Sequence, residues 1–231
     1  MQEQIIKFTK RDATVITGGT SQTSKMPCKS WSIPVFMCQR GSKLMQVEGS
    51  VCSDCYADRG MYHMYRDNIE PAQVARWDAL TTAMETPDGL RLWAMAIARI
   101  IGDDDEFRWL DAGDLQSADM LSAIALVATL TPRTKHWLPT REYEFVAEYL
   151  QKSMPIPKNL VIRLSALMVD QPMKIPSALR DHPQVVASEV HTTDTVREGV
   201  FPCGAYTRGG KCGPCRACWN PEVKVVSYPK H

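Results

Sequence analysis

The sequence predicts an α/β fold on a parallel sheet, either a partial or irregular (β/α) barrel or an open sheet. Segments with the pattern of strands alternate with segments with the pattern of helices between residues 107 and 191. The predicted strands start at Phe107, His136, Leu160 and Val185, which are 29, 24 and 25 residues apart. Strands that alternate with helices at this period are typical of right-handed crossovers in a parallel sheet. The 231 residues, 44% of them hydrophobic, suffice for one core, so we expect a single α/β domain over residues 1–231.

The repeating β/α core, residues 107–191, contains four predicted strands and two predicted helices. Short runs of aromatic, β-branched and leucine residues favour the strands. The apolar stripe of Leu121, Ile124, Ala125 and Ala128 favours a helix that covers one face of the sheet. In chain order we expect a strand at 107–110, a helix at 117–130, a strand at 136–139, a helix at 143–150, and strands at 160–164 and 185–188.

The chain before this core divides into a loop-rich segment and two helices. Residues 12–56 are rich in Gly, Ser, Thr and Cys, which predicts loops, with short apolar runs at 31–37 and 44–47 as candidate strands. Val74, Trp77, Leu80 and Met84 recur at helical spacing and predict a helix over 71–84, for which Pro71 suits the first turn. A second helix is expected over 90–101, ended by Gly102.

Composition and charge limit the class of protein. The charged share of 23% and the formal net charge of +1 are those of an ordinary globular protein, and no basic run indicates nucleic acid as a partner. The first residues lack the apolar run of a signal peptide, and no stretch reaches the length of a membrane span. We therefore expect a cytoplasmic protein with no membrane partner.

The eight cysteines carry the strongest functional signal, because they fall into two sets near the two ends of the chain. Thiols stay reduced in the cytoplasm, so cysteines at these spacings predict metal ligands instead of disulfides. Three cysteines spaced by two residues fit a 4Fe-4S cluster better than zinc, which remains the alternative. One cluster or two are both compatible with the spacing. The predicted metal ligands are Cys28, Cys38, Cys52 and Cys55 in the Cys-rich N-terminal segment, and Cys203, Cys212, Cys215 and Cys218 in the Cys-rich loop 201–220.

Polar side chains follow the predicted strands at their carboxyl ends, where ligands bind in parallel α/β folds. Carboxylates and guanidinium groups together suit general acid/base work or a polar ligand. Each member also has a structural interpretation, such as a helix cap for Asp114 or Ser117 or an exposed ion pair for Arg141 and Glu142. The candidate catalytic residues are Asp111, Asp114, Arg141, Glu142, Arg163 and His191, and the candidate cofactor-binding residues are Gln116, Ser117 and Ser165.

Several motifs resemble one bacteriophage family, called gene product eighty-eight. They are SKMPCKSW, GSVCSDCYADRGMY, RWLDAGDLQS, WLPTREYE, NLVIRLSA, CGAYTRGGKCGPCRACW and VSYPKH, and they cover nearly the whole chain. This resemblance implies a phage origin and a site in the cytoplasm of the infected bacterium, and it implies no particular activity.

A weaker resemblance is to the radical SAM superfamily, in which a cluster-binding loop follows the first strand of a parallel barrel. Residues 52–57, Cys-Ser-Asp-Cys-Tyr-Ala, are similar to that loop, and residues 111–114 are similar to the segment after the second strand. The usual Cys-x3-Cys-x2-Cys is missing, and Cys38 would have to be the first ligand. The resemblance implies S-adenosylmethionine (SAM) as a cofactor only if one iron has no cysteine ligand, because a cluster with four cysteines has no open iron.

The sequence therefore supports three hypotheses. The first is a phage-encoded iron-sulfur enzyme with redox or radical-SAM-like chemistry at the strand ends, acting on a small molecule or another substrate. The second is a hydrolase of esters or amides, in which Asp111, Asp114 and His191 act while the metal is structural. The third is a metal-stabilised binding protein without enzymatic activity, whose partner is a host protein.

Overall fold

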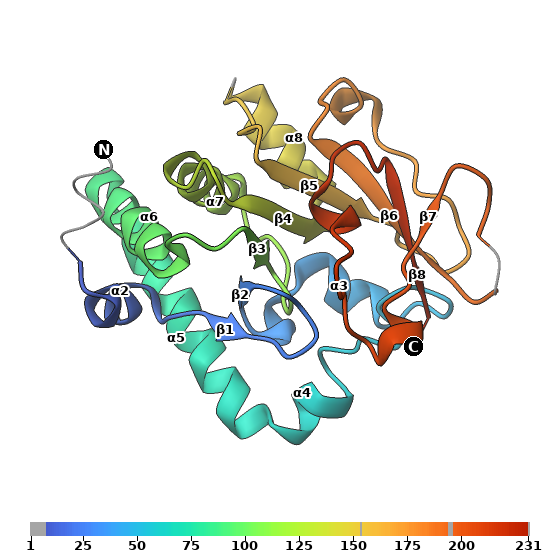
Figure 1. Ribbon diagram of the computed structural model, residues 1–231, viewed down its shortest axis with the longest axis horizontal. Coiled ribbons are helices and arrows are strands. Elements are labelled where there is room, and N and C mark those ends of the chain that lie inside the picture. The colour runs from blue at the N-terminus through green and yellow to red at the C-terminus, as the bar shows by residue number, and fades with distance from the viewer. Residues whose placement is uncertain (1–7, 153, 194–195, 231) are drawn as a thin grey trace.

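A computed structural model describes residues 8–152, 154–193 and 196–230 of the chain (Figure 1). These residues form one eight-stranded sheet and seven α-helices. The strands are β1 (Ser21–Gln22), β2 (Lys29–Trp31), β3 (Glu106–Trp109), β4 (Lys135–Thr140), β5 (Leu160–Ser165), β6 (Val185–His191), β7 (Phe201–Pro202) and β8 (Val225–Pro229). The helices are α2 (Lys10–Thr17), α3 (Gln39–Leu44), α4 (Gly60–Met64), α5 (Arg66–Met84), α6 (Pro87–Ile101), α7 (Ala118–Leu130) and α8 (Tyr143–Gln151).

The sheet is mostly parallel, which confirms the predicted α/β fold. Its strand order is β1-β2-β3-β4-β5-β6-β8-β7, and every neighbouring pair is parallel except β1 with β2. The strands β1 and β7 lie at opposite edges of the sheet. Among the described strands no pairing joins these two edges, so the sheet is open.

The elements of the repeating core lie where the sequence predicts them, within a few residues at each end. The strand β6 extends three residues beyond the predicted end, to His191. Before the core, α6 starts at Pro87 instead of residue 90. The strand β8 was not predicted. It pairs with β6 over five residues, from Ala187–Val225 to His191–Pro229, and so extends the parallel sheet by one strand.

Three predictions in the first third of the chain differ from the structure. Of the candidate strand at 31–37 only Trp31 lies in a strand, at the end of β2, and Val35–Met37 form a short 3-10 helix. Residues 44–47 form no strand, because Met45, Gln46 and Val47 donate their N–H groups to carbonyls three or four residues back and so continue the turn after α3. The helix predicted to start at Pro71 starts at Arg66, so Pro71 lies inside α5. A proline there removes one helical hydrogen bond but keeps its fixed φ within the helical range.

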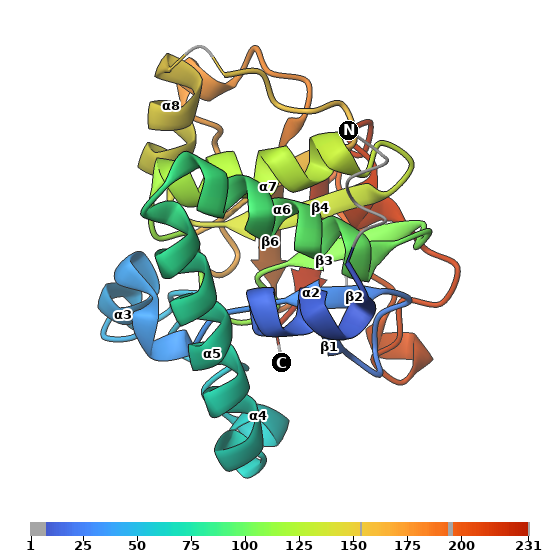
Figure 2. The ribbon, with the colours of Figure 1, turned by 90° about the vertical axis from the view of Figure 1, so that its left-hand side faces the viewer.

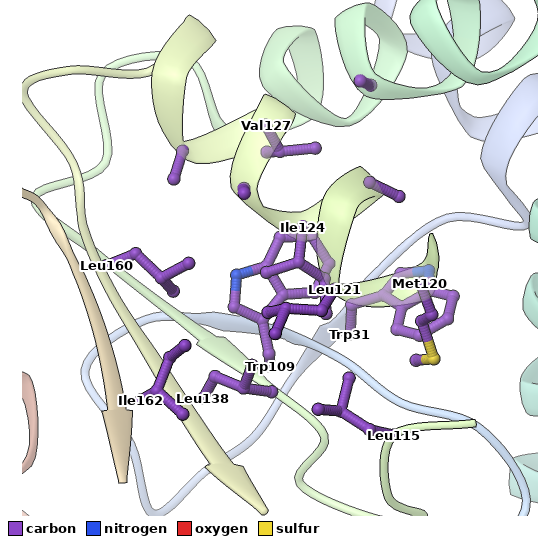
Figure 3. Packing of buried hydrophobic residues seen from close by; sticks show 14 of the residues in the cluster. Trp31, Trp109, Leu115, Met120, Leu121, Ile124, Val127, Leu138, Leu160 and Ile162 are labelled. Atoms are coloured by element: carbon purple, nitrogen blue, oxygen red, sulfur yellow. The ribbon is translucent and has the colours of Figure 1, made fainter. Parts of the chain in front are cut away.

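The alternation of side chains along the strands divides the residues between two faces of the sheet. Phe107, Trp109, Leu138 and Ile162 belong to the main hydrophobic core together with residues of α6, α7 and α8. Figure 3 shows Leu121, Ile124 and Val127 of α7 over the strand side chains of Trp109, Leu138 and Ile162. In Figure 2 the helices α6 and α7 lie together over the same face of the sheet, while α4 and the start of α5 project from the body.

The opposite face of the sheet, here called the inner face, is covered by the C-terminal segment 201–223 instead of by helices. Trp137 of β4 packs there edge-on against Trp219, with ring centroids 5.1 Å apart. Arg163 of β5 donates hydrogen bonds to the carbonyl oxygens of Ala217, Asn220 and Val223 in this segment and to that of Ala187. Polar contacts from a fully buried arginine therefore fix the C-terminal segment onto the sheet.

The described residues contain no helix that is long and apolar enough to cross a membrane.

His136 is buried in the main core next to the tryptophan cluster. Trp109 donates its Nε1–H to His136 Nδ1 at 3.2 Å, so the ring proton is on Nε2, which lies 2.8 Å from Thr131 Oγ1. Burial lowers the pKa of His136 to about 3. The imidazole is therefore neutral and fully hydrogen-bonded in the folded protein at ordinary pH.

This histidine should make the protein less stable as the pH falls from about 6.5, the pKa of an unfolded histidine, towards 3. Within that window the unfolded chain binds a proton that the folded chain does not bind, so acid favours unfolding. At pH 4.5 the free energy of unfolding should have fallen by about 2 to 3 kcal/mol through this group, since each pH unit contributes about 1.4 kcal/mol. His136→Gln should lack that contribution. Urea unfolding of both proteins at pH 7 and pH 4.5 measures the difference. An equal decrease in the free energy of unfolding of the two proteins would refute this role of His136.

Candidate metal centres and the strand-end site

The polar residues that follow β3 and β4 at the carboxyl ends of these strands are called the strand-end site. The loop after β3 forms its floor. Leu110 has a positive φ of 52°, and its N–H donates to the carbonyl oxygen of Trp31 at 2.6 Å. Ile33 N–H donates to the carbonyl oxygen of Ala112 at 3.3 Å. The loop thus lies across the carboxyl end of β2, and Gly113 meets Ile33 there with a φ of 77°.

Gly113→Ala should destabilise the protein strongly, because a Cβ at this position would lie 2.3 Å from Ile33 Cγ1 and 2.8 Å from Ile33 O. Gly199 is the matched control, since its φ of 78° is nearly the same and a Cβ added there would meet nothing within 4 Å. Gly199→Ala should cost about 1 to 2 kcal/mol, the strain of a left-handed residue. Gly113→Ala should cost about 2 kcal/mol more through the clash. Thermal or urea unfolding measures both, and equal losses would show that the close approach is unimportant.

Asp114 links the ends of β3 and β4. It is buried, and its Oδ1 accepts hydrogen bonds from Thr140 Oγ1 at 2.6 Å and from Leu115 N at 2.8 Å. Its Oδ2 accepts from the backbone N–H of Arg141 at 3.0 Å. Burial raises the pKa of Asp114, while the Arg141 charge and these hydrogen bonds oppose the rise. Both carboxylate oxygens are occupied, so Asp114 positions the strand ends.

Asp111 differs from Asp114 because one of its oxygens is free. It is also buried, and Tyr62 donates its hydroxyl to Oδ2, while Tyr56 donates to the backbone carbonyl oxygen. The other carboxylate oxygen, Oδ1, is buried without a hydrogen-bond partner among the described residues. Burial lowers the pKa of the nearby Arg76 guanidinium, and the Asp111 charge partly offsets this effect. Asp111 therefore offers an unused acceptor inside the site.

Three cysteines of the N-terminal segment meet above these strand ends. Cys38 precedes α3, and Cys52 and Cys55 follow it; Gly41 of that helix lies between the first two. A Cβ at Gly41 would lie 2.9 Å from Cys38 Cβ, 3.6 Å from Cys38 Sγ and 3.8 Å from Cys52 Sγ, so this position packs tightly against both cysteines. Burial raises the pKa of the Cys38 thiol, and the nearby Asp114 carboxylate and the Cys55 and Cys52 thiols raise it further.

The loop that holds these cysteines is attached across the sheet ends. Val51 N–H donates to the carbonyl oxygen of Leu167 at 3.0 Å, and Val169 N–H donates to that of Gly49 at 2.9 Å. The buried Ser50 hydroxyl donates to the carbonyl oxygen of Leu44 and accepts from Ser53 N–H. The cysteine loop therefore spans from the end of β2 to the segment that follows β5.

Arg141 lies close enough to this group of thiols that its charge lowers the pKa values of Cys38 and Cys52, against the larger effect of burial. Burial lowers its pKa, but Cys52, Asp114, Tyr56 and Cys55 raise it more, so the net shift is upwards. The guanidinium Nε has no hydrogen-bond partner among the described residues. A positive charge with a free donor thus lies beside three thiols and a carboxylate.

Cys28 belongs to the C-terminal cysteines and not to the N-terminal group. It lies directly before β2, whereas Cys38 follows the carboxyl end of that strand, and β2 extends for three residues, or about 10 Å. Burial raises the pKa of Cys28 to about 12, and its charged or ionisable neighbours are Glu106, Arg108, Cys212 and Arg216. Cys28 also packs with Cys218, Cys203 and Cys215 in the hydrophobic cluster on the inner face.

The C-terminal group therefore contains five thiols, Cys28, Cys203, Cys212, Cys215 and Cys218. Burial raises the pKa of Cys212, and the Cys203 thiol raises it further. Burial also raises the pKa of Cys218 to about 11, although Tyr228 Oη lies 3.2 Å from its sulfur and lowers it. All eight cysteines of the chain are free thiols.

Arg108 lies between the two groups of cysteines. Its guanidinium stacks over the Trp137 ring at 4.4 Å and donates to Tyr56 Oη at 3.2 Å, next to Cys55. The same charge lowers the pKa values of Cys28, Cys212 and Cys218 on the inner face, where burial is the larger opposite effect. This half-buried cation therefore acts on the C-terminal thiols and is joined through Tyr56 to the loop that holds Cys55.

Several of the predicted site residues make hydrogen bonds within the protein instead of presenting free polar atoms to a ligand. Ser117 is the N-cap of α7 and accepts from Met120 N–H at 3.1 Å. Gln116 bonds to Gln39 and to the Asp114 carbonyl oxygen, and Ser165 accepts from Ser188 Oγ at 3.2 Å. Glu142 is buried and accepts from the Arg40 N–H at 2.7 Å.

His191 and Arg163 lie away from Asp111 and Asp114. Arg163 is occupied by the carbonyl groups of the C-terminal segment. His191 Nδ1 lies 2.7 Å from Ser227 Oγ, and the ring lines a cavity of about 250 Å³ with Asp170, Glu189 and Arg197. Among the described residues no hydrogen bond or ion pair joins His191 to Asp111 or Asp114.

Two tyrosines and an arginine that were not predicted from the sequence complete the strand-end site, namely Tyr56, Tyr62 and Arg108. Tyr56 directly follows Cys55, and that adjacency is the only signal that could have drawn attention to it. Arg108 alternates with the core residues Phe107 and Trp109, so its inward direction follows from the strand period once the strand is recognised. Nothing in the local sequence associates Tyr62 with Asp111, 49 residues later.

In the described part of the chain, no group of three or more His, Cys, Asp or Glu side chains is arranged to hold a metal ion.

The fold and the grouped thiols define a mixed α/β protein with one group of cysteines at the carboxyl ends of a mostly parallel sheet and a second group on its inner face. The chain belongs to the bacteriophage Gene product 88 family, whose model matches residues 7–221. This confirms the family resemblance seen in the sequence motifs. No curated protein and no solved structure matches the chain.

Proposed function

We propose that this protein is an iron-sulfur enzyme with two separate cluster sites and a reaction site at the carboxyl ends of the strands. The single observation that carries the proposal is the division of the cysteines into three above the strand ends and five on the inner face. Cys38, Cys52 and Cys55 would hold the first cluster. Four of the five thiols Cys28, Cys203, Cys212, Cys215 and Cys218 would hold the second.

The environment of the first group supports a cluster there. Gly41 has no side chain, so α3 approaches both Cys38 and Cys52 closely, and a Cβ there would lie only 2.9 Å from Cys38 Cβ. A 4Fe-4S cluster is larger than one ion, so its cysteines stand farther apart than the ligands of a single metal. The Arg141 guanidinium would offset the negative charge of three thiolates, and cluster binding would displace their protons.

Three cysteine ligands leave one of four irons without a protein ligand, and this supports SAM as the cofactor. The loop position agrees with that proposal, since the three cysteines follow the first parallel strand, β2. A cluster held there would supply an electron to SAM. The chain's own residues would then position the ligands, with the free Oδ1 of Asp111 as an acceptor for an amine or hydroxyl group and Arg141 as a donor for a carboxylate.

The second group, with four or more thiols available, would hold a cluster that is fully ligated by protein. Its place on the inner face, where Arg163 and Arg108 also lie, suits a structural or electron-transfer role. Arg108 links the surroundings of both sites through Tyr56 and Trp137.

Anaerobic reconstitution with iron and sulfide tests the proposal. The protein should become brown, with broad absorbance near 400 nm, and should contain about eight iron atoms per chain if both sites hold 4Fe-4S clusters. A colourless protein that retains stoichiometric zinc after the same treatment would contradict it. The hydrolase alternative lacks support in the described residues, because His191 lies apart from Asp111 and Asp114, and a host protein partner remains a prediction.

A further inference from the structure

A groove on the described part of the chain lies away from the strand ends. It has a volume of about 870 Å³ and is lined by the loops that precede β4 and β5 together with the C-terminal segment 201–223. These loops form the amino-terminal edge of the sheet. The groove is therefore separate from the proposed reaction site, although Cys215 of the second cysteine group lies on its wall.

Five cations line this groove, and no aspartate or glutamate does. They are Arg133, Lys135, Lys158, Arg208 and Arg216. All except the half-buried Arg216 are exposed. A local positive potential follows even though the whole chain has a formal net charge of only +1.

Most of these cations have no partly buried acidic partner, although the exposed Arg208 donates to the carbonyl oxygens of Lys211 and Cys212 in its own loop. Among the described residues, Lys135 and Lys158 form no ion pair. Arg133 pairs with Asp103, but both side chains are more than 80% exposed, so the pair contributes little and can open. Arg216 is held by Glu106 at 2.8 Å and is the one cation of the groove with a partly buried acidic partner.

The groove also offers an aromatic ring and apolar walls. Phe201 is 40% exposed on its rim, and Pro132, Pro214 and Pro221 line it. Exposed aromatic rings beside cations are the arrangement that binds single-stranded nucleic acid, since phosphates pair with the cations and bases stack on the ring. The cations come from three separate segments along an open surface, which suits a strand better than one enclosed nucleotide.

We propose that this groove binds a segment of single-stranded nucleic acid. The phosphate backbone contacts Lys135, Lys158 and Arg208, and one base stacks on Phe201. The sequence contains no basic run because these residues are spread between positions 133 and 216, and only the fold brings them together. The bound strand contacts none of the cysteine sulfurs, so its binding is independent of the proposed iron-sulfur clusters.

Fluorescence anisotropy with a labelled single-stranded oligothymidylate tests the proposal on the full-length protein as purified. Binding should weaken at higher salt, and Lys135→Gln/Lys158→Gln should weaken it at least tenfold. The slope of log K against log salt should fall by about 1.4, because each contact to a single strand contributes about 0.7. Phe201→Ala should weaken binding without changing that slope.

The matched control is Lys10→Gln/Lys174→Gln, which removes two exposed lysines outside the groove. It should bind the strand as the wild type does. The proposal is overturned if the wild type does not bind at low salt, if the control loses as much affinity as the groove variant, or if a mononucleotide competes as well as the strand. Circular dichroism of each variant checks that it is folded.

Discussion

Addition of SAM to the reduced, cluster-loaded protein should change the electron paramagnetic resonance (EPR) spectrum of one of its two centres and leave the other unchanged. The physical reason is the ligand count. If Cys38, Cys52 and Cys55 hold a 4Fe-4S cluster as proposed, they would leave one iron without a protein ligand, whereas the C-terminal group has enough thiols for a complete shell. Only an open iron can take the amine and carboxylate of a methionine derivative.

Two variants make this prediction specific. Cys52→Ser/Cys55→Ser should lose the SAM-sensitive signal and about half of the bound iron, and should keep the second signal. Cys212→Ser/Cys215→Ser should lose the insensitive signal and retain the response to SAM. A spectrum that SAM leaves unchanged in the wild type, or a response that survives in the first variant, would refute an open iron at this site.

Arg163→Met should cost about 3 to 5 kcal/mol in the free energy of unfolding, the largest stability effect we expect from one substitution. Arg163 is fully buried, and its guanidinium serves the carbonyl oxygens of Ala187, Ala217, Asn220 and Val223. Methionine fills a similar volume but donates no hydrogen bond, so these buried acceptors lose their donor. The C-terminal segment should detach first, because three of the four carbonyls belong to it.

Urea unfolding of the metal-free protein measures this cost without a contribution from clusters. Arg180→Met is the control, since Arg180 is exposed and its side chain bonds to a single carbonyl oxygen, that of Ile175. It should change stability by less than about 0.5 kcal/mol. A cost below about 1 kcal/mol for Arg163→Met would mean that water replaces the guanidinium and that its hydrogen bonds to the C-terminal segment are unimportant for stability.

The sequence predicts the repeating core well because local pattern and tertiary environment agree there. The stripe on α7 and the short apolar runs of β3 to β6 bury the faces that their periods indicate. The strand β8 escapes prediction because Val225 and Val226 are its only strongly strand-forming apolar residues before the polar end. The turn at residues 44–47 is mispredicted because its apolar residues satisfy their backbone locally, which a composition rule does not detect.

The sequence predicts which types of residue form the candidate site, but it does not predict which of these residues lie together. Spacing along the chain associates Cys28 with Cys38, but the direction of β2 separates them, and long-range pairing with β3 fixes that direction. Likewise, Arg163 and Arg141 look equivalent as arginines near strand ends. The first points inward to backbone carbonyls, whereas the second lies beside the thiols. These differences depend on which segments cover the sheet, and local patterns do not determine that.

Native mass spectrometry of the anaerobically reconstituted protein is the most direct test of the division into two centres. The wild type should carry two clusters per chain. Cys38→Ala/Cys52→Ala/Cys55→Ala should carry one, and Cys212→Ala/Cys215→Ala/Cys218→Ala should also carry one. Cys28→Ala should retain the SAM-sensitive cluster. A single cluster in the wild type that disappears in both triple variants would show that the eight cysteines converge on one shared centre and would contradict the division proposed here.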